Sequence, residues 1–223
     1  MAQADWMLAA SLPSEVAGAD MGGEDVAGRF AEEEQIVAKA VRKRQVEFFA
    51  GRACARRALA AFGVPEVPIG QVNGRGPRWP AGFVGSITHC DGYRAAAVAR
   101  AEDIFTIGID AEPDAPLPKE VLELVASPSE QQAMAHLRTT DAEAHWDRLL
   151  FSAKESVFKA WSPITGEWLG FEDVEVHIDR EAGAFQARLL RKPWTLGEQV
   201  LSEFAGRWMS GRGLLLTAVV IRR

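Results

Sequence analysis

The segment 105–113, FTIGIDAEP, is the part of the sequence that most constrains the fold. Its apolar residues at 105, 107 and 109 alternate with residues 108, 110 and 112, a period of two that predicts a β-strand. Asp110 and Glu112 therefore project from one face of this strand, with Cα atoms about 6.5 Å apart. Two carboxylates on one face repel each other unless a cation or a proton lies between them. On spacing alone, two solvated acids at an exposed strand end are the more common explanation.

The remainder of the chain mixes strand and helix patterns in both halves, which predicts an α+β architecture. Helix is expected within 31–63, with a break between 41 and 51, and after a capping box at 127–130. A second capping box at 140–143 is expected to start a long helix that ends near the Ser162-Pro163 pair. Residues 14–28 and 70–82 are expected to be loops. Further strands are expected at 6–12, 83–88, 93–100, 174–178, 185–190 and 214–221.

Length and composition fit a globular protein of one large or two small domains, with 223 residues, 48% of them hydrophobic and 25% charged. A net charge of -6 argues against a general nucleic-acid binder. Cys54 and Cys90 form no C-x-x-C pair, which argues against a zinc or redox motif and favours a reducing cytoplasm. The apolar run at 6–12 is too short for a signal peptide, and no stretch approaches the roughly 18 apolar residues of a membrane span. We therefore expect a cytoplasmic protein that binds neither nucleic acid nor membrane.

Two other segments carry residues suited to phosphate chemistry. In FSAKESVFKAW, Glu155 and Lys159 lie four residues apart and share one face of a helix. In GSITHC, Ser86, Thr88 and His89 are polar groups that can contact a phosphate. Taken separately, each has an ordinary explanation: a surface ion pair contributes only about a few tenths of a kcal/mol, and a histidine is more often structural.

Basic residues recur between positions 43 and 78. A solvated helix face is the ordinary explanation for such a run. Arg52 and Arg56 lie four residues apart, however, so they can converge on one anion, and arginine suits bidentate contact with phosphate. The basic residues are Lys43, Arg44, Arg52, Arg56, Arg57, Arg75 and Arg78.

Taken together, these segments are far more specific than any one of them. The ordered set GRACAR, RGPRWP, GSITHC, GIDAE and FSAKESVFKAW resembles the phosphopantetheinyl transferases of the surfactin and enterobactin type. It is most similar to the actinobacterial members that serve polyketide, nonribosomal peptide and lipid synthases. The resemblance runs from 43 to 171 and is extended by WLGFED at 168–173. It implies two similar α/β lobes related by a pseudo-twofold, 1–112 and 113–223, with coenzyme A in the cleft between them.

The resemblance also implies a divalent metal. By similarity, Asp110, Glu112 and Glu155 are ligands of Mg²⁺, with Mn²⁺ as the other candidate. Mg²⁺ prefers oxygen ligands and usually divides its coordination between carboxylates and substrate phosphates. Lys159 resembles the family lysine that contacts the pyrophosphate. Glu155 is also the family's candidate base for the attacking serine hydroxyl, directly or through water.

The remaining residues are assigned by similarity to coenzyme A. One group contacts the 3′-phosphate and the adjoining nucleotide: Arg44, Arg52, Arg75 and His89. Ser86 and Thr88 add hydrogen bonds. A second group lines the channel for the pantetheine arm: Phe158, Trp168 and Leu169.

The implied reaction is the transfer of phosphopantetheine from coenzyme A to a serine of acyl or peptidyl carrier proteins, releasing 3′,5′-ADP. The expected partners are carriers of fatty-acid, polyketide or nonribosomal peptide synthases, including those of siderophore biosynthesis. A monomer is expected, because one chain supplies both halves of the cleft. The alternative is a regulatory module that binds coenzyme A without turnover. The presence of all three acids and Lys159 disfavours that alternative, and a metal-dependent phosphodiesterase lacks any visible motif.

Overall fold

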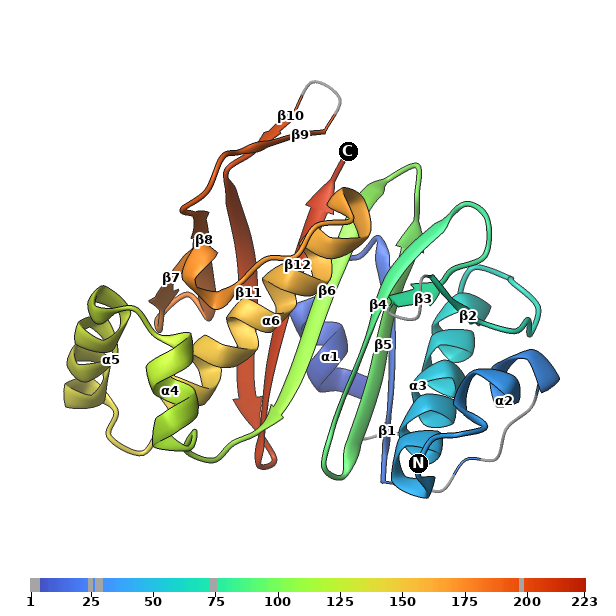
Figure 1. The fold of residues 1–223 in the computed structure, drawn as a ribbon, viewed down its shortest axis with the longest axis horizontal. Coiled ribbons are helices and arrows are strands. Elements are labelled where there is room, and N and C mark those ends of the chain that lie inside the picture. Colours follow the sequence, from blue (N-terminus) through green and yellow to red (C-terminus); the bar gives the residue numbers. More distant parts are fainter. Residues whose placement is uncertain (1–4, 24–25, 27–29, 73–75, 197–198) are drawn as a thin grey trace.

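Two main β-sheets, accompanied by two short two-stranded sheets and flanked by helices, form the molecule (Figure 1). The computed structural model describes residues 5–23, 26, 30–72, 76–196 and 199–223. Helix α3 (Arg42–Ala60) packs on one sheet, and helix α6 (Trp146–Thr165) crosses the face of the other. The two sheets meet where strand β4 (Phe83–Cys90) lies beside strand β6 (Ile104–Pro113). The mixture of helix and sheet confirms the predicted α+β class.

The smaller sheet holds three antiparallel strands in the order β1-β5-β4. Its other two strands are β1 (Val16–Gly22) and β5 (Tyr93–Arg100). Residues 95–99 of the central strand β5 are fully buried, and all but one are alanines, so α3 can approach the sheet closely. Two further elements accompany α3: helix α2 (Ala31–Val37), which precedes it, and the short hairpin of β2 (Gly70–Val72) and β3 (Gly76–Arg78).

The larger sheet holds five antiparallel strands in the order β6-β12-β11-β8-β7. Its remaining strands are β12 (Leu214–Arg222), β11 (Glu203–Gly211), β8 (Ala184–Leu189) and β7 (Val174–Asp179). Buried and more exposed residues alternate along β7 and β8, so at these two strands one face of the sheet carries the apolar core and the other faces solvent. Helix α6 lies on the core face, where Trp161 and Phe185 are among the largest fully buried side chains.

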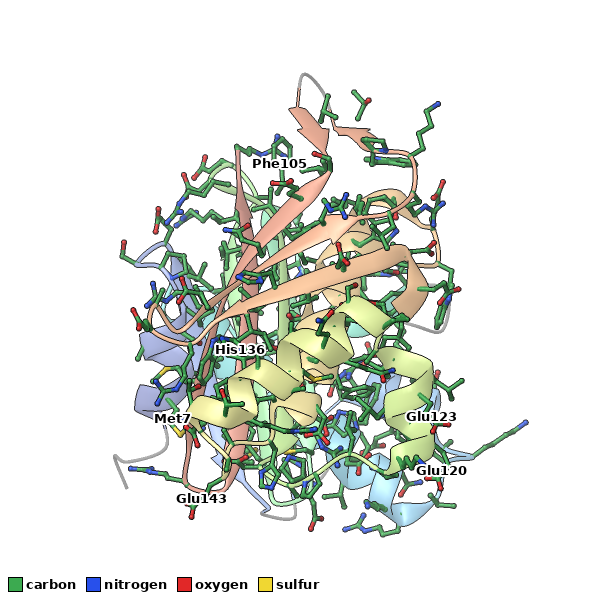
Figure 2. All side chains as sticks on the ribbon, turned by 90° about the vertical axis from the view of Figure 1, so that its left-hand side faces the viewer. Met7, Phe105, Glu120, Glu123, His136 and Glu143 are labelled. Atoms are coloured by element: carbon green, nitrogen blue, oxygen red, sulfur yellow. The ribbon has the colours of Figure 1, made fainter. Side chains whose placement is uncertain are left out.

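Shorter elements surround the larger sheet. Figure 2 views the side that carries α4, marked by Glu120 and Glu123, and α5, marked by His136. Helix α1 packs on the face of β6 and β12 opposite α6, because Met7 and Leu8 share a core cluster with Leu216 and Ala218. The bounds are α1 (Asp5–Ser11), α4 (Lys119–Val125), α5 (Pro128–Thr140), the 3₁₀ turn η1 (Phe171–Asp173), β9 (Trp194–Leu196) and β10 (Gln199–Leu201).

Side-chain hydroxyls of β4 join the two sheets. Ser86 Oγ accepts a hydrogen bond from the backbone N–H of Ile109 at 3.1 Å. Thr88 Oγ1 accepts one from the backbone N–H of Ala111 at 3.0 Å. Residues 86 and 88 share one face of β4, so both hydroxyls point at β6. This contact fixes β6, the strand that carries Asp110 and Glu112, against the smaller sheet.

Several sequence expectations about secondary structure are wrong. Residues 6–11 of the run 6–12 lie in helix α1 rather than in a strand, because a short apolar run has no periodicity that separates the two. The expected loop 14–28 contains β1, which is a strand because β5 pairs with it along its whole length. The expected loop 70–82 contains the hairpin β2–β3. Strand β11 was not predicted at all.

Helix boundaries differ from the expectation in three places. The break between α2 and α3 lies at 38–41, just before the predicted interval. The capping box of α5 at 127–130 is confirmed, with both reciprocal hydrogen bonds present. The box predicted at 140–143 does not form, since α5 runs through Thr140 and α6 begins only at Trp146. Helix α6 also continues through Pro163 to Thr165 and ends at Gly166, whose φ of 69° is left-handed.

The division of the chain at residue 112 stays a prediction. In the structure, β5 of the smaller sheet ends at Arg100, and β6 already pairs with β12 of the larger sheet. Within the described ranges, no helix is both long enough and apolar enough to span a bilayer.

Candidate active site

Gly108 allows strand β6 and helix α6 to meet backbone to backbone. A Cβ atom at position 108 would collide with the carbonyl oxygen of Ser156 and approach the backbone nitrogen of Ala160. Beside this contact, Thr106 Oγ1 donates a hydrogen bond to the carbonyl oxygen of Ala160 at 2.8 Å. The strand that carries the acid pair is therefore in direct contact with the helix that carries Glu155 and Lys159.

Asp110 lies at the centre of the site, with a side chain only 6% exposed. Its Oδ1 accepts hydrogen bonds from Lys159 Nζ at 2.6 Å and from Thr88 Oγ1 at 3.2 Å. Its Oδ2 is buried and has no hydrogen-bond partner among the described residues. A buried carboxylate oxygen without a partner is costly, so this atom marks a position where a cation or a hydrogen-bond donor would be stabilised.

Glu112 is held by Arg148, a residue that the sequence analysis missed. Arg148 Nη1 donates to Glu112 Oε2 at 2.9 Å, and both side chains are largely buried, at 17% and 18% exposure. Arg148 lies seven residues before Glu155 on α6 and so shares its helix face, which is the signal that could have identified it.

The carboxyl groups of the site influence one another's pKa. Burial raises the pKa of Glu155, and the negative charge of Asp110 raises it further, while Lys159 lowers it. Burial and Asp110 also raise the pKa of Glu112, against the lowering effect of Arg148. Both shifts come first from burial, which disfavours the charged carboxylate, and second from repulsion by the charge of Asp110.

Lys159 and Arg148 supply the positive charge at the acids in this structure. Among the residues that the structure describes, no three or more His, Cys, Asp or Glu side chains gather closely enough to form a metal-binding cluster. The predicted ligands Asp110 and Glu112 instead form ion pairs with Lys159 and Arg148.

Arg44 and His89 lie together at one side of the site. Arg44 Nη1 is 3.3 Å from His89 Nε2, and Glu47 Oε2 is 3.2 Å from the same ring nitrogen. Nε2 either accepts from Arg44 or donates to Glu47, depending on the tautomer. Burial lowers the pKa of His89; Glu47 opposes this shift, and the charges of Arg44, Lys159 and Arg94 reinforce it.

Arg52 and Arg56 are both buried, and each has partners within the protein. Arg56 forms an ion pair with Glu33, which also accepts the backbone N–H of Ile69 at 2.8 Å. Arg52 lies 3.5 Å from the ring centroid of Phe48, and burial lowers its pKa to about 10. Arg75, which the sequence analysis assigned to coenzyme A, lies outside the described residues.

Of the three residues assigned to the pantetheine channel, two are in ring contact and the third is buried in the core. The rings of Phe158 and Trp168 are in contact, with centroids 5.0 Å apart, and Trp168 is 67% exposed. Leu169 is instead buried in the core beneath α6. Ser86 and Thr88 use their hydroxyl oxygens to bind β6.

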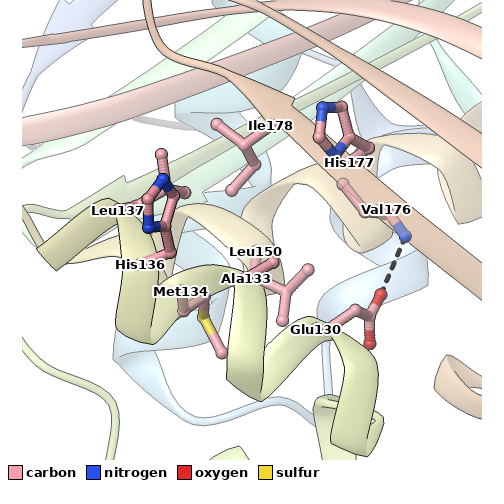
Figure 3. A pocket seen from close by; sticks show the side chains of 9 residues that line it. All are labelled: Glu130, Ala133, Met134, His136, Leu137, Leu150, Val176, His177 and Ile178. Atoms are coloured by element: carbon pink, nitrogen blue, oxygen red, sulfur yellow. Dashed lines mark hydrogen bonds between the residues drawn. The ribbon is translucent and has the colours of Figure 1, made fainter.

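Lys154, the residue beside Glu155, forms a buried ion pair that the sequence analysis also missed. Its Nζ donates to Glu130 Oε2 at 2.8 Å, and both side chains are 2% exposed. Lys154 also donates to the carbonyl oxygens of Val125 and Phe171. Figure 3 shows the other oxygen of Glu130 accepting the N–H of Val176, beside a cavity of about 100 Å³ between α5 and β7. This cavity contains none of the site residues, so we assign it no part in the chemistry.

Comparison with known proteins finds family matches over both halves of the chain. Residues 32–99 match the family described as the 4′-phosphopantetheinyl transferase N-terminal domain, and residues 106–208 match the 4′-phosphopantetheinyl transferase superfamily. The chain is 49% identical over 219 residues to 4′-phosphopantetheinyl transferase Svp of Streptomyces mobaraensis, covering 96% of this chain and 89% of that one. It is 45% identical to Npt of Nocardia iowensis, covering 96% and 99%. It is also 45% identical to PptT of Mycobacterium tuberculosis, covering 85% of both chains.

Proposed function

Because this chain belongs to the 4′-phosphopantetheinyl transferase superfamily, it is a phosphopantetheinyl transferase, and we propose that it moves the phosphopantetheine arm from coenzyme A to a serine of acyl and peptidyl carrier proteins. The observation that carries the proposal is the meeting of Asp110 and Lys159, with Glu155 close enough for Asp110 to raise its pKa. A module that only bound coenzyme A would need no buried acids at the phosphate end.

We further propose that Asp110, Glu112 and Glu155 hold Mg²⁺ or Mn²⁺. Three carboxylates form the all-oxygen donor set that these ions prefer. The unpartnered Oδ2 of Asp110 and the raised pKa values of Glu112 and Glu155 support the fit, because a cation would relieve both. When bound, Mg²⁺ would supply charge neutralisation at the phosphate oxygens of coenzyme A.

In this proposal, side chains of the protein accept the proton of the carrier serine and neutralise part of the charge on the leaving group. The carrier serine oxygen forms a bond to the phosphorus that bears pantetheine, and the bond from that phosphorus to the bridging oxygen breaks, releasing 3′,5′-ADP. Glu155 takes the serine proton, and burial, which raises its pKa, makes it a stronger base than an ordinary carboxylate. Lys159 neutralises the charge that develops on the leaving phosphate.

Arg44 and His89 are proposed to contact the nucleotide, with Arg52 and Arg75 as the other predicted contacts. Arg44 Nη1 and His89 Nε2 are 3.3 Å apart, so one phosphate could reach both. Ser86 and Thr88 stay proposed as further contacts. The contacting rings of Phe158 and Trp168 offer an apolar surface for the pantetheine arm.

The proposed partners are carriers of fatty-acid, polyketide and nonribosomal peptide synthases, including those that make siderophores. Carrier proteins are acidic around the modified serine, whereas this chain has a net charge of -6, so global attraction cannot drive association. We expect docking through a small, partly apolar surface near the site, weakened only modestly by salt. The monomer and the cytoplasmic location stay predictions.

Mass spectrometry of carrier proteins tests the proposed function. Representative fatty-acid, polyketide and peptide carriers would be incubated with the enzyme, coenzyme A and Mg²⁺. The proposal predicts that the arm is added covalently, and that a carrier whose serine is replaced by alanine gains no mass. Calorimetric binding of coenzyme A without mass gain on any carrier would support the regulatory module instead.

A further inference from the structure

Residues at the start of α6 hold the segment that follows Glu112 through side-chain hydrogen bonds. His145 Nδ1 lies 2.8 Å from Asp114 Oδ1. Asp147 Oδ2 accepts the backbone N–H of Leu117 at 3.1 Å. Consequently the segment 114–117, which continues from β6, is fixed to the same helix that carries Glu155.

Arg148 contacts both this segment and the acidic site. Its Nε donates to the carbonyl oxygen of Ala115 at 3.0 Å, and its Nη2 donates to that of Pro116 at 2.9 Å. Its third nitrogen, Nη1, donates to Glu112 Oε2 at 2.9 Å. Two backbone carbonyls therefore set the position of the guanidinium independently of the carboxylate that it contacts.

We propose that Arg148 is a positioning residue for Glu112 and sets the affinity of the acidic site for a divalent cation. The inference rests on the proposed function, because it takes Glu112 as a ligand. Arg148 engages only Oε2 of Glu112, which fixes the rotation of the carboxylate. Ligating carboxylates are commonly held in this way, and loss of the outer hydrogen bond typically lowers metal affinity by about 10- to 100-fold.

The proposal requires the planar guanidinium of arginine, whose three nitrogens donate in different directions. Lysine would keep the positive charge, but its single ammonium nitrogen cannot reproduce three separately directed bonds in a plane. A charge-only role and a positioning role therefore predict different results for Arg148→Lys. A charge-only role also predicts tighter cation binding when the charge is removed, because the guanidinium would merely compete with the metal for Glu112.

The test is Mn²⁺ binding followed by electron paramagnetic resonance, with saturating coenzyme A present and a protein-free titration subtracted. Arg148→Gln and Arg148→Lys should each weaken Mn²⁺ binding by about tenfold or more. Arg138→Gln is the matched control, because Arg138 is 47% exposed and contacts Asp147 rather than Glu112. It should leave the Mn²⁺ dissociation constant within about twofold. Thermal unfolding of each variant shows whether it is folded. If Arg148→Gln does not fold, Arg148→Lys, which keeps the charge, provides the test.

Each outcome decides the question. Weaker Mn²⁺ binding in both Arg148 variants, with normal binding in Arg138→Gln, supports the positioning role. Unchanged or tighter binding in Arg148→Gln, or full rescue by Arg148→Lys, overturns it while leaving the proposed function intact. A wild-type protein that binds no Mn²⁺ would overturn the proposed metal site and this inference with it, whereas carrier modification would still test the transferase activity separately.

Discussion

Gly108 on β6 lies so close to Ser156 on α6 that a Cβ atom at position 108 would overlap the Ser156 carbonyl oxygen. Gly108→Ala should therefore push strand and helix apart and lower the free energy of unfolding by about 1–3 kcal/mol or more. Gly22→Ala is the control, since no atom lies within 4 Å of a Cβ built at that glycine. Urea denaturation would measure both, and equal stability of the two variants would contradict the close contact.

Glu155→Gln should separate binding of coenzyme A from transfer. The variant keeps its size and one carbonyl oxygen but loses its charge and its ability to take a proton, so it should bind coenzyme A and transfer very slowly. Raising Mg²⁺ should restore only part of the rate, because excess metal can repair occupancy but cannot supply a base. The measurement is a Mg²⁺ titration of turnover, with Asp110→Asn beside it. Full rescue of Glu155→Gln would leave Glu155 as a ligand and remove it as the base, and near-normal wild-type turnover without added metal would refute the mechanism.

Nucleotide binding should be linked to the protonation of His89. In the free protein, burial and the charges of Arg44, Lys159 and Arg94 keep the pKa of His89 below 6.5, despite the opposing charge of Glu47. A bound phosphate would raise this pKa, so binding takes up a proton and the affinity rises as pH falls through the raised value. Calorimetry with 3′,5′-ADP between about pH 8 and pH 6 would measure the slope. His89→Gln should reduce that slope, and an identical slope would exclude His89.

Arg52 and His89 should serve binding of coenzyme A more than chemistry. Alanine at either position should raise KM strongly and leave kcat comparatively intact. Arg52 is buried against Phe48, so Arg52→Ala should also lower the melting temperature, whereas His89, with 39% of its side chain exposed, should tolerate the change better. Steady-state kinetics and thermal unfolding test this pair. A collapsed kcat with unchanged KM would contradict the assignment.

The buried ion pair between Lys154 and Glu130 should stabilise the folded protein. Lys154→Met leaves a buried carboxylate without its cation, which should cost about 3–5 kcal/mol of unfolding free energy. The double variant Lys154→Met/Glu130→Gln should recover part of this loss, because no unpaired charge remains. Lys119→Met, at an 84% exposed position, is the control and should change stability by less than about 0.5 kcal/mol. Denaturant unfolding of the wild type and the three variants measures these losses, and a loss in Lys154→Met no larger than in the control would show that the pair contributes little.

Local sequence determined the elements whose signals lie within a few residues. The alternation at 105–113 predicted strand β6, and the capping box at 127–130 predicted the start of α5. The motifs also led to the family, because the comparisons match both halves of the chain. By contrast, residues 6–12 carry no local signal that separates helix from strand, and β1 is a strand only because β5 pairs with it.

Only the tertiary structure decided how charged residues are paired. Glu112 and Arg148 are 36 residues apart, and Glu130 and Lys154 are 24 apart, so no local pattern predicts either pair. The sequence alone established that Asp110 and Glu112 share a strand face, and that Glu155 and Lys159 share a helix face. Whether the two faces meet depends on the approach of β6 to α6, which the missing side chain at Gly108 permits. Local sequence patterns carry no information about such contacts, because packing brings together residues that lie far apart along the chain.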